Sequence, residues 1–368
     1  MKGQWFGTYE GNIPGAIMVN VDEALDHYKI DAYIKPNTTE LPSSEVNIST
    51  INKDANQENL VGEIKYFNPT NGIWSEWQDI KSYYPNVISH SSNANVNFKF
   101  DGDQLLVNAT TDTDFTINTN LARRSVNAYS RIPSESMTWS DFKIYLSTLP
   151  KSQFLFRGQK ESWSLRTLFH RCGRYRMSEF IQNDIKKLHQ KLSAITTHLF
   201  DLSIPDQNGS FFNLVQHHGY PTPLLDWTYS PYVAAFFAFR DWSIGCDEDK
   251  CARIYKFDHE AWTGINPPIL NIDPPEPHLS VTNFIAINNP RLVPQQSVTT
   301  VTNVDDIESF VQFWEDRTKI KFIEAIDIPA NQRDEVMKDL RFMGITAGSM
   351  FPGIDGVCEE LREQNFDS

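Results

Sequence analysis

The spacing of apolar residues changes near residue 120, and this change limits the chain to folds with two differently built parts. Before it, apolar and polar residues alternate, as at 17–21, 28–32 and 96–100. After it, apolar residues recur every three or four positions, at Ile181, Ile185, Leu188, Leu192, Ile195 and Leu199. Alternation is typical of half-buried strands, and the longer spacing is typical of one face of a helix.

We therefore predict an α+β chain of two domains. Residues 1–120 would form an all-β meander, closed into a small barrel or paired as a sandwich, with a hairpin turn at Asp101-Gly102. Residues 121–136 would be a linker, and residues 137–368 a mixed α and β domain. In that second part we expect strands at 154–157, 254–257, 292–301 and 321–326, one long helix over 181–199, and a helix at 333–341.

Length and composition narrow the possible functions. A chain of 368 residues can bury two cores, and none of its apolar runs approaches the roughly 18 residues of a membrane span. The residues after Met1 contain no apolar stretch like that of a secretory signal, so we expect a cytoplasmic protein. The net charge of −14 argues against nonspecific binding of nucleic acid.

Two clusters are read as structural rather than functional. A basic group, Arg171, Arg174, Arg176, Lys186 and Lys187, is more easily explained as a solvated helix face than as a binding patch. Cys246 and Cys251 flank an acidic loop, but no second pair of ligands accompanies them, so we expect no metal site.

The segment from Asp226 to Phe237 carries the clearest signal of a binding site. Ser230 followed by Pro231 and an apolar run predicts a helix with Ser230 as its N-cap. Free backbone N–H groups gather at such a helix start, which suits a phosphate. Asp226 lies between apolar residues, so it would orient Arg157 or His217, act as an acid or base, or form a structural ion pair.

Arg157 follows the apolar residues 154–156 and precedes Gly158. An arginine at the end of a strand, next to a glycine that allows close approach, suits a bidentate grip on a phosphate. The alternative is a structural salt bridge. Both readings stay open on the sequence alone.

These segments resemble a known family. Phe156-Arg-Gly-Gln, Trp163-Ser-Leu, the run from Gln216 to Pro231 and Phe351-Pro-Gly-Ile-Asp-Gly closely resemble the FRG domain over residues 135–366. The family is distantly similar to the ADP-ribosyltransferase fold, so the resemblance implies NAD as substrate. It would assign the diphosphate to Arg157, the ribose to Thr228 and Ser230, an aromatic such as Trp227 to the nicotinamide, and the ribose 2′-OH to Gln295 or Gln296. Further cofactor contacts are implied for Phe156, Gly158, Gln159, Gln216 and His217.

The chain departs from the pattern at three positions. Gln295 or Gln296 stands where ADP-ribosyltransferases usually carry Glu, Pro223 where the family commonly has Arg, and Ser297 where it commonly has Gly. A glutamine positions a hydroxyl but does not balance the positive charge that develops in ribosyl transfer. Glu324 is the carboxylate best placed in the sequence to substitute.

Two functions follow as expectations. One is an NAD-using ADP-ribosyltransferase or NAD glycohydrolase, in a toxin or phage-defence setting, whose N-terminal domain meets an acceptor or regulator. The other is a non-catalytic nucleotide-binding sensor, which the glutamine favours. A nuclease or metallohydrolase is disfavoured, because no acidic or histidine ligands cluster in the sequence.

Overall fold

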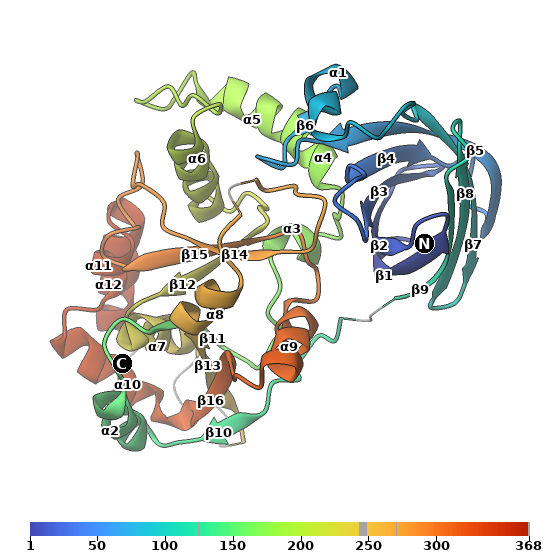
Figure 1. The fold of residues 1–368 in the computed structure, drawn as a ribbon. Coiled ribbons are helices and arrows are strands. Elements are labelled where there is room, and N and C mark those ends of the chain that lie inside the picture. The colour runs from blue at the N-terminus through green and yellow to red at the C-terminus, as the bar shows by residue number, and fades with distance from the viewer. Residues whose placement is uncertain (124–125, 243–248, 270, 367–368) are drawn as a thin grey trace.

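The computed structural model describes residues 1–123, 126–242, 249–269 and 271–366. Its strands form two separate sheets, one of nine strands (β1 to β9) and one of seven (β10 to β16). Figure 1 shows the first sheet curled into a barrel, in blue and teal, beside a second body built around the other sheet. No strand among the described residues belongs to both sheets, which confirms the predicted two-part architecture.

The barrel strands are β1 (Gly3–Gly11), β2 (Gly15–Glu23), β3 (Tyr28–Pro36), β4 (Ser44–Ser49), β5 (Asn56–Phe67), β6 (Trp74–Ser75), β7 (Asn93–Asp101), β8 (Gln104–Thr111) and β9 (Thr116–Arg123). Their order is β4-β3-β2-β1-β9-β8-β7-β5, and β4 also pairs with β5, which closes an antiparallel ring of eight strands. The short β6 pairs with β5, and the helical turns α1 (Trp77–Ile80) and η1 (Lys81–Tyr83) follow it.

Apolar side chains from alternate strand positions fill the interior of this barrel. One side chain in two points inward and is almost fully buried, as for Trp5, Tyr9, Val19, Phe98 and Leu105. Asp101 pairs with Gln104 across the turn between β7 and β8, and Gly102 takes a φ of 59° there. The hairpin predicted from the Asp-Gly pair is confirmed, because glycine adopts this left-handed conformation at little cost.

The second sheet contains β10 (Ser134–Ser136), β11 (Phe154–Gln159), β12 (Leu224–Thr228), β13 (Cys251–Asp258), β14 (Leu279–Thr282), β15 (Ser297–Thr302) and β16 (Ile323–Pro329). Its order is β10-β16-β13-β11-β12-β15-β14. Only β10 runs parallel to its neighbour, and the other pairs are antiparallel. The strands predicted at 154–157, 254–257 and 321–326 correspond to β11, β13 and β16.

Helices cover both faces of this sheet. They are α2 (Trp139–Thr148), α3 (Leu168–Arg171), α4 (Met177–Glu179), η2 (Phe180–Asp184), α5 (Ile185–Leu192), α6 (Pro205–His217), α7 (Pro231–Phe239), α8 (His259–Ile265), α9 (Ile307–Thr318), η3 (Ala330–Gln332), α10 (Arg333–Phe342), α11 (Ala347–Met350) and α12 (Ile354–Phe366). Residues of α2, α7, α10 and α11 share one core with the sheet, and residues of α8 and α9 share another. The helix expected at 333–341 is α10.

The long helix predicted over 181–199 is wrong in its second half. A π-helical turn, η2, leads into α5, which ends at Leu192, and Ile195 and Leu199 are 78% and 71% exposed. The hydroxyl of Ser193 donates to the carbonyl of His189, and that of Thr196 donates to Leu192. The backbone N–H groups of both residues bond the same carbonyls, and the chain then leaves the helix through a turn that the apolar spacing does not mark.

The strand predicted at 292–301 is also shorter than expected. Residues 291–296 form a turn, and β15 begins only at Ser297. Gln296 takes a φ of 47°, a left-handed conformation that a strand does not use. The two glutamines compared with a strand carboxylate therefore lie in a turn that precedes the strand.

Candidate functional site

Strand β12 leads directly into α7, and the predicted helix start is confirmed. The Ser230 hydroxyl accepts a hydrogen bond of 3.3 Å from the backbone N–H of Val233, and Pro231 occupies the first helical turn. Thr228 supports the same turn, because its hydroxyl accepts from the N–H of Ser230 at 3.0 Å. N-capping therefore accounts for Ser230, and its predicted contact with a ribose stays a prediction.

The first motif lies on β11, which pairs with β12 through Phe156 and Thr228. Phe156 is buried in the core that contains α7. A Cβ atom on Gly158 would lie only 1.8 Å from the carbonyl oxygen of Ala234 in that helix. Close packing of α7 on β11 thus explains why residue 158 is a glycine, without any ligand. The cofactor contacts predicted for Phe156 and Gly158 stay predictions.

Arg157 points to the Asp226 segment. Its Nη1 donates a hydrogen bond of 2.7 Å to the backbone carbonyl of Asp226. Its Nε is buried and has no hydrogen-bond partner among the described residues. Burial lowers the pKa of Arg157 to about 10, the charge of Asp226 opposes this shift, and that of Arg171 adds to it. Arg157 is thus half-buried, with its Nε withdrawn from water and no carboxylate hydrogen-bonded to its guanidinium.

Gln216 holds the Asp226 side chain. Its amide donates to Asp226 Oδ2 at 3.1 Å and to the carbonyl of Leu224 at 3.3 Å, while its oxygen accepts from the Thr222 hydroxyl. Asp226 Oδ1 is buried and has no hydrogen-bond partner in the described part of the chain. One carboxylate oxygen is therefore fixed, and the other has no group to accept from.

His217 lies on the other side of Asp226. The amide nitrogen of Asn289 lies 2.6 Å from His217 Nδ1, so the imidazole has a polar neighbour at this nitrogen. Burial lowers the pKa of His217, Asp226 acts against this shift, and Arg291 acts with it. Burial therefore favours the neutral form of this imidazole.

Two further arginines belong to the segments around Arg157 and His217, because the charge of Arg171 acts on Arg157 and that of Arg291 acts on His217. Arg171 Nε donates to the carbonyl of Arg166 at 3.1 Å, and Arg291 Nη1 donates to the carbonyl of His217 at 2.8 Å. Like Arg157, they bond backbone oxygens, and within the described ranges none of the three forms an ion pair. This gives a local excess of positive charge in a chain whose net charge is −14.

Gln295 and Gln296 lie in the turn before β15, beside Thr228 and Tyr229 at the end of β12. The Gln295 side chain is buried and donates to the carbonyl of Met350 at 2.9 Å, while its backbone oxygen accepts from the Thr228 hydroxyl at 2.7 Å. Gln296 is exposed, and its carbonyl accepts from the N–H of Tyr229 at 3.1 Å. They border the start of α7, whereas Arg157 bonds the carbonyl of Asp226, two residues before the end of β12. Their predicted bond to a ribose stays a prediction.

Other predicted positions have structural partners. The indole of Trp227 is buried and donates to the Thr300 hydroxyl at 3.1 Å, and Gln159 donates to the carbonyl of Trp163 at 2.7 Å. Glu324 forms an ion pair with Lys256 on β13, two strands away from β12. Their predicted contacts with a ligand stay predictions.

The sequence did not single out Arg291 or Asn289, because the Asn-Pro-Arg run that contains them matches no motif. Arg171 was noted only within a basic group, and the structure divides that group. Arg174 and Arg176 pair with Asp22 and Asp31 of the barrel, so they form no free basic patch.

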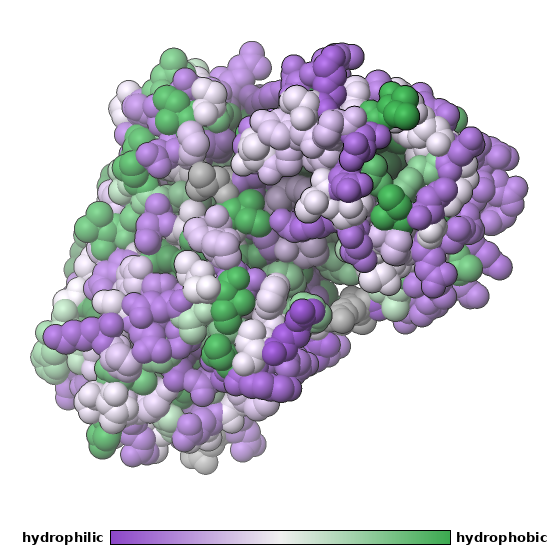
Figure 2. Space-filling view, in the orientation of Figure 1, coloured by the Kyte–Doolittle hydropathy of each residue, from purple (hydrophilic) through white to green (hydrophobic). Residues whose placement is uncertain are grey.

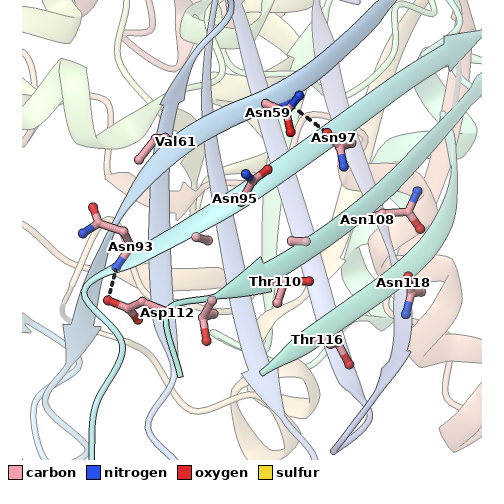
Figure 3. A pocket seen from close by; sticks show the side chains of 13 residues that line it. Asn59, Val61, Asn93, Asn95, Asn97, Asn108, Thr110, Asp112, Thr116 and Asn118 are labelled. Carbon is pink, nitrogen blue, oxygen red and sulfur yellow. Dashed lines mark hydrogen bonds between the residues drawn. The ribbon is translucent and has the colours of Figure 1, made fainter. Parts of the chain in front are cut away.

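A hollow of about 650 Å³ lies on the outer face of β5, β7, β8 and β9. Figure 3 shows its lining, which consists mainly of asparagine and threonine side chains such as Asn97, Asn108, Thr110 and Asn118. Asp112 is the one charged residue in this lining, and Figure 2 shows hydrophilic residues over most of the visible barrel surface. Without cations, this hollow is unsuited to phosphate.

No group of three or more His, Cys, Asp or Glu residues suited to a metal ion occurs in the part of the chain that the structure describes. Cys246, considered above with Cys251, lies outside the described residues, as does Arg124 in the predicted linker. None of the helices that the structure describes has both the length and the apolar character needed to cross a membrane.

Comparison with known families gives a match for the central part of the chain. Residues 152–244 match the model of the FRG domain. The protein carries an FRG domain. The matched segment includes β11, α6, β12 and α7, and therefore Arg157, Gln216 and Asp226, while Arg291 and the two glutamines lie beyond it. Neither a curated protein nor a solved structure matches the chain.

Proposed function

We propose that the FRG domain binds a nucleotide through its phosphate groups, held by Arg157, Arg171 and Arg291. The observation that carries this proposal is that these three arginines bond backbone oxygens and, among the described residues, form no ion pair. Nearby arginines differ, since Arg166, Arg174 and Arg176 each pair with an aspartate.

An unpaired charge that has been removed from water destabilises a fold, and the cost is recovered when an opposite charge bonds to it. Arg157 is in this position, because its Nε is buried without a partner and its pKa is lowered to about 10. A diphosphate supplies the missing acceptors, and its oxygens match the fork of a guanidinium. The neutral form of His217, near the same carboxylate, adds a polar group without a further charge.

Tyr229, directly after β12, offers a surface for the nucleoside part of the proposed ligand. The ring of Tyr229, three residues after Asp226, is 36% exposed and meets His259 edge to face, with ring centroids 5.6 Å apart. An exposed aromatic face next to a phosphate site gives a base or nicotinamide ring a surface for stacking. The exposed Gln296 bonds the backbone of the same tyrosine.

Titration calorimetry of the full chain with ADP and with adenosine tests the proposal. We expect ADP to bind and adenosine to bind far more weakly, because the phosphates supply the charge. Arg157→Met should weaken ADP binding about ten- to hundredfold, as expected for the loss of hydrogen bonds to a charged group. Arg317→Met is the matched control, since Arg317 is exposed on α9 and stacks on Phe313 and Trp314. Equal affinity for ADP and adenosine, or no effect of Arg157→Met, would contradict the proposal.

A second candidate, ADP-ribosyl transfer from NAD, is favoured by the free Oδ1 of Asp226. A carboxylate balances an oxocarbenium charge as it develops, which a glutamine does not do. Nicotinamide release from NAD should then be lost in Asp226→Asn and kept in Gln295→Ala. Release that survives Asp226→Asn would reject Asp226 in that role, and absence of release alongside tight ADP binding would leave binding as the function.

A further inference from the structure

The barrel packs against the FRG-containing body through buried polar residues. Gln4, Asp22, Asp31 and Tyr33, from β1, β2 and β3, are each at most 7% exposed and bond residues of the other sheet's domain. Two of these contacts, through Gln4 and Asp22, meet at Arg166, between β11 and α3. The other two end at Arg176 and Asp273.

The first contact passes through Asp305, just after β15. Gln4 accepts a hydrogen bond of 2.9 Å from the backbone N–H of Asp305 and donates to the carbonyl of Asn303 at 2.7 Å. The carboxylate of Asp305 is held by Arg166 in a bidentate pair, through Nε and, at 3.0 Å, through Nη2. The two side chains are 10% and 23% exposed, so solvent only partly screens their attraction.

The second contact passes through Tyr175. Asp22 on β2 accepts a hydrogen bond of 2.7 Å from the backbone N–H of Tyr175 and pairs with the neighbouring Arg174 at 2.8 Å. The hydroxyl of Tyr175 accepts from Arg166 Nη2 at 3.3 Å. The barrel thus contacts both residues that bond the Arg166 side chain: β1 contacts Asp305, and β2 contacts Tyr175.

Arg166 in turn holds Arg171. The carbonyl of Arg166 accepts the 3.1 Å hydrogen bond from Arg171 Nε. Arg171 is the last residue of α3, which lies between the central sheet and the barrel (Figure 1). The same short helix contacts the segment before β12, because the N–H of Phe169 donates to the carbonyl of Thr222 at 3.2 Å, and Thr222 bonds Gln216, which holds Asp226. The charge of Arg171 also acts on Arg157.

We propose that the docked barrel positions Arg171 for the phosphate ligand through Arg166, so that barrel docking and ligand binding strengthen each other. Arg166 is then a positioning residue, and the barrel regulates the site without touching the ligand. This inference rests on the proposed function. The coupling is reciprocal by thermodynamic necessity, so the ligand also favours the docked barrel.

The test is a double substitution, Gln4→Ala with Asp22→Asn, in the full-length protein. It removes the barrel's contacts with Asp305 and Tyr175, and both positions lie outside the proposed site. The matched control is Tyr33→Phe, which loses the 2.7 Å bond to Asp273 at the same interface but does not touch Arg166. Asp103→Asn, at an exposed loop of the barrel, controls for the charge change. Each variant is measured for hydrogen exchange at residues 168–172 and for ADP affinity.

We expect the double variant to exchange faster at residues 168–172 and to bind ADP about five- to tenfold more weakly, a typical allosteric coupling. The two controls should keep the wild-type affinity. Faster exchange without a loss of affinity would overturn the proposal, because the link would then be structural only. An equal loss of affinity in Tyr33→Phe would also overturn it, since the effect would reflect general loosening of the interface.

Two further measurements separate this inference from the proposed function and from a failure to fold. Arg166→Lys keeps a positive charge for Asp305, whereas Arg166→Met does not, so the lysine variant should recover part of the affinity that the methionine variant loses. If wild type does not bind ADP, the proposed function fails, and the mechanical link is judged by exchange alone. Unchanged exchange at residues 168–172 in the double variant would then reject the link.

Discussion

Arg157 Nη1 donates a hydrogen bond of 2.7 Å to the backbone carbonyl of Asp226, although 69 residues separate them in the chain. The bond joins the two motifs of the FRG domain at one point. Because the acceptor is the carbonyl rather than the carboxylate, the charge of the guanidinium is not neutralised by a direct ion pair. The carboxylate is bonded instead by Gln216. This division leaves both charged groups with an unused atom, Nε of Arg157 and Oδ1 of Asp226.

Asp226→Asn is expected to strengthen ADP binding while it destabilises the fold. The negative charge of Asp226 acts on both Arg157 and His217. Its loss removes the repulsion between this carboxylate and a bound phosphate. It also removes a charge that offsets the buried guanidinium, so we expect a loss of about 1–3 kcal/mol in the free energy of unfolding. Calorimetry with ADP and urea unfolding measure the two effects. Weaker ADP binding with unchanged stability would show that the carboxylate contacts the ligand.

Gly158→Ala should destabilise the protein strongly, because the added Cβ would lie 1.8 Å from the backbone oxygen of Ala234. Backbone atoms cannot give way as a side chain tip does, so β11 and α7 would separate, at a cost of about 3 kcal/mol or more. Gly264→Ala is the matched control, since a Cβ there meets nothing within 4 Å. Urea unfolding of both variants provides the comparison, and similar midpoints would refute the packing role of Gly158.

The interface around Asp273 predicts a stability that falls as the solution becomes alkaline. Burial raises the pKa of Asp273 to about 8, and burial also raises that of Glu45, both near Tyr33. Between the ordinary carboxyl value and about 8, the folded chain keeps a proton that the unfolded chain has released, so the free energy of unfolding decreases with pH. Below about 6.5 two buried histidines oppose this slope, because burial lowers the pKa of His170 to about 3 and that of His278 to about 4, so their unfolded forms bind more protons there.

Thermal unfolding between pH 6.5 and 8.5 measures this slope. The groups that face Asp273 include Asp31, which raises its pKa, and Arg176, which opposes the shift. Asp273→Asn keeps an acceptor for the Tyr33 hydroxyl but does not titrate, so its melting temperature should decline less over this interval than that of wild type. Parallel slopes for the two proteins would exclude Asp273 as the source.

Local signals in the sequence predicted much of the fold. Alternation predicted the barrel, because the inward positions of its strands form one core. The pair Ser230-Pro231 predicted the start of α7, since both residues act through their own backbone turn. The end of α5 was missed because the apolar spacing continues to Leu199, whereas the helix ends at Leu192 and Ile195 and Leu199 are exposed.

The candidate site was only partly predictable. Arg157 and Asp226 lie in motifs, so the sequence named both, and the structure joins them. Arg291 reaches His217 from a turn 74 residues away, and no local pattern marks such a contact. The role of Gly158 was attributed to ligand approach, because a sequence does not show that α7 packs on that position.

A crystal structure of the full chain with ADP would test the central claim most directly. We predict that the diphosphate lies within hydrogen-bond distance of Arg157 Nε, between Arg171 and Arg291, with the barrel docked as in the free chain. A diphosphate bound elsewhere, such as in the asparagine-lined hollow of the barrel, or one that leaves Arg157 Nε without a partner, would contradict the account.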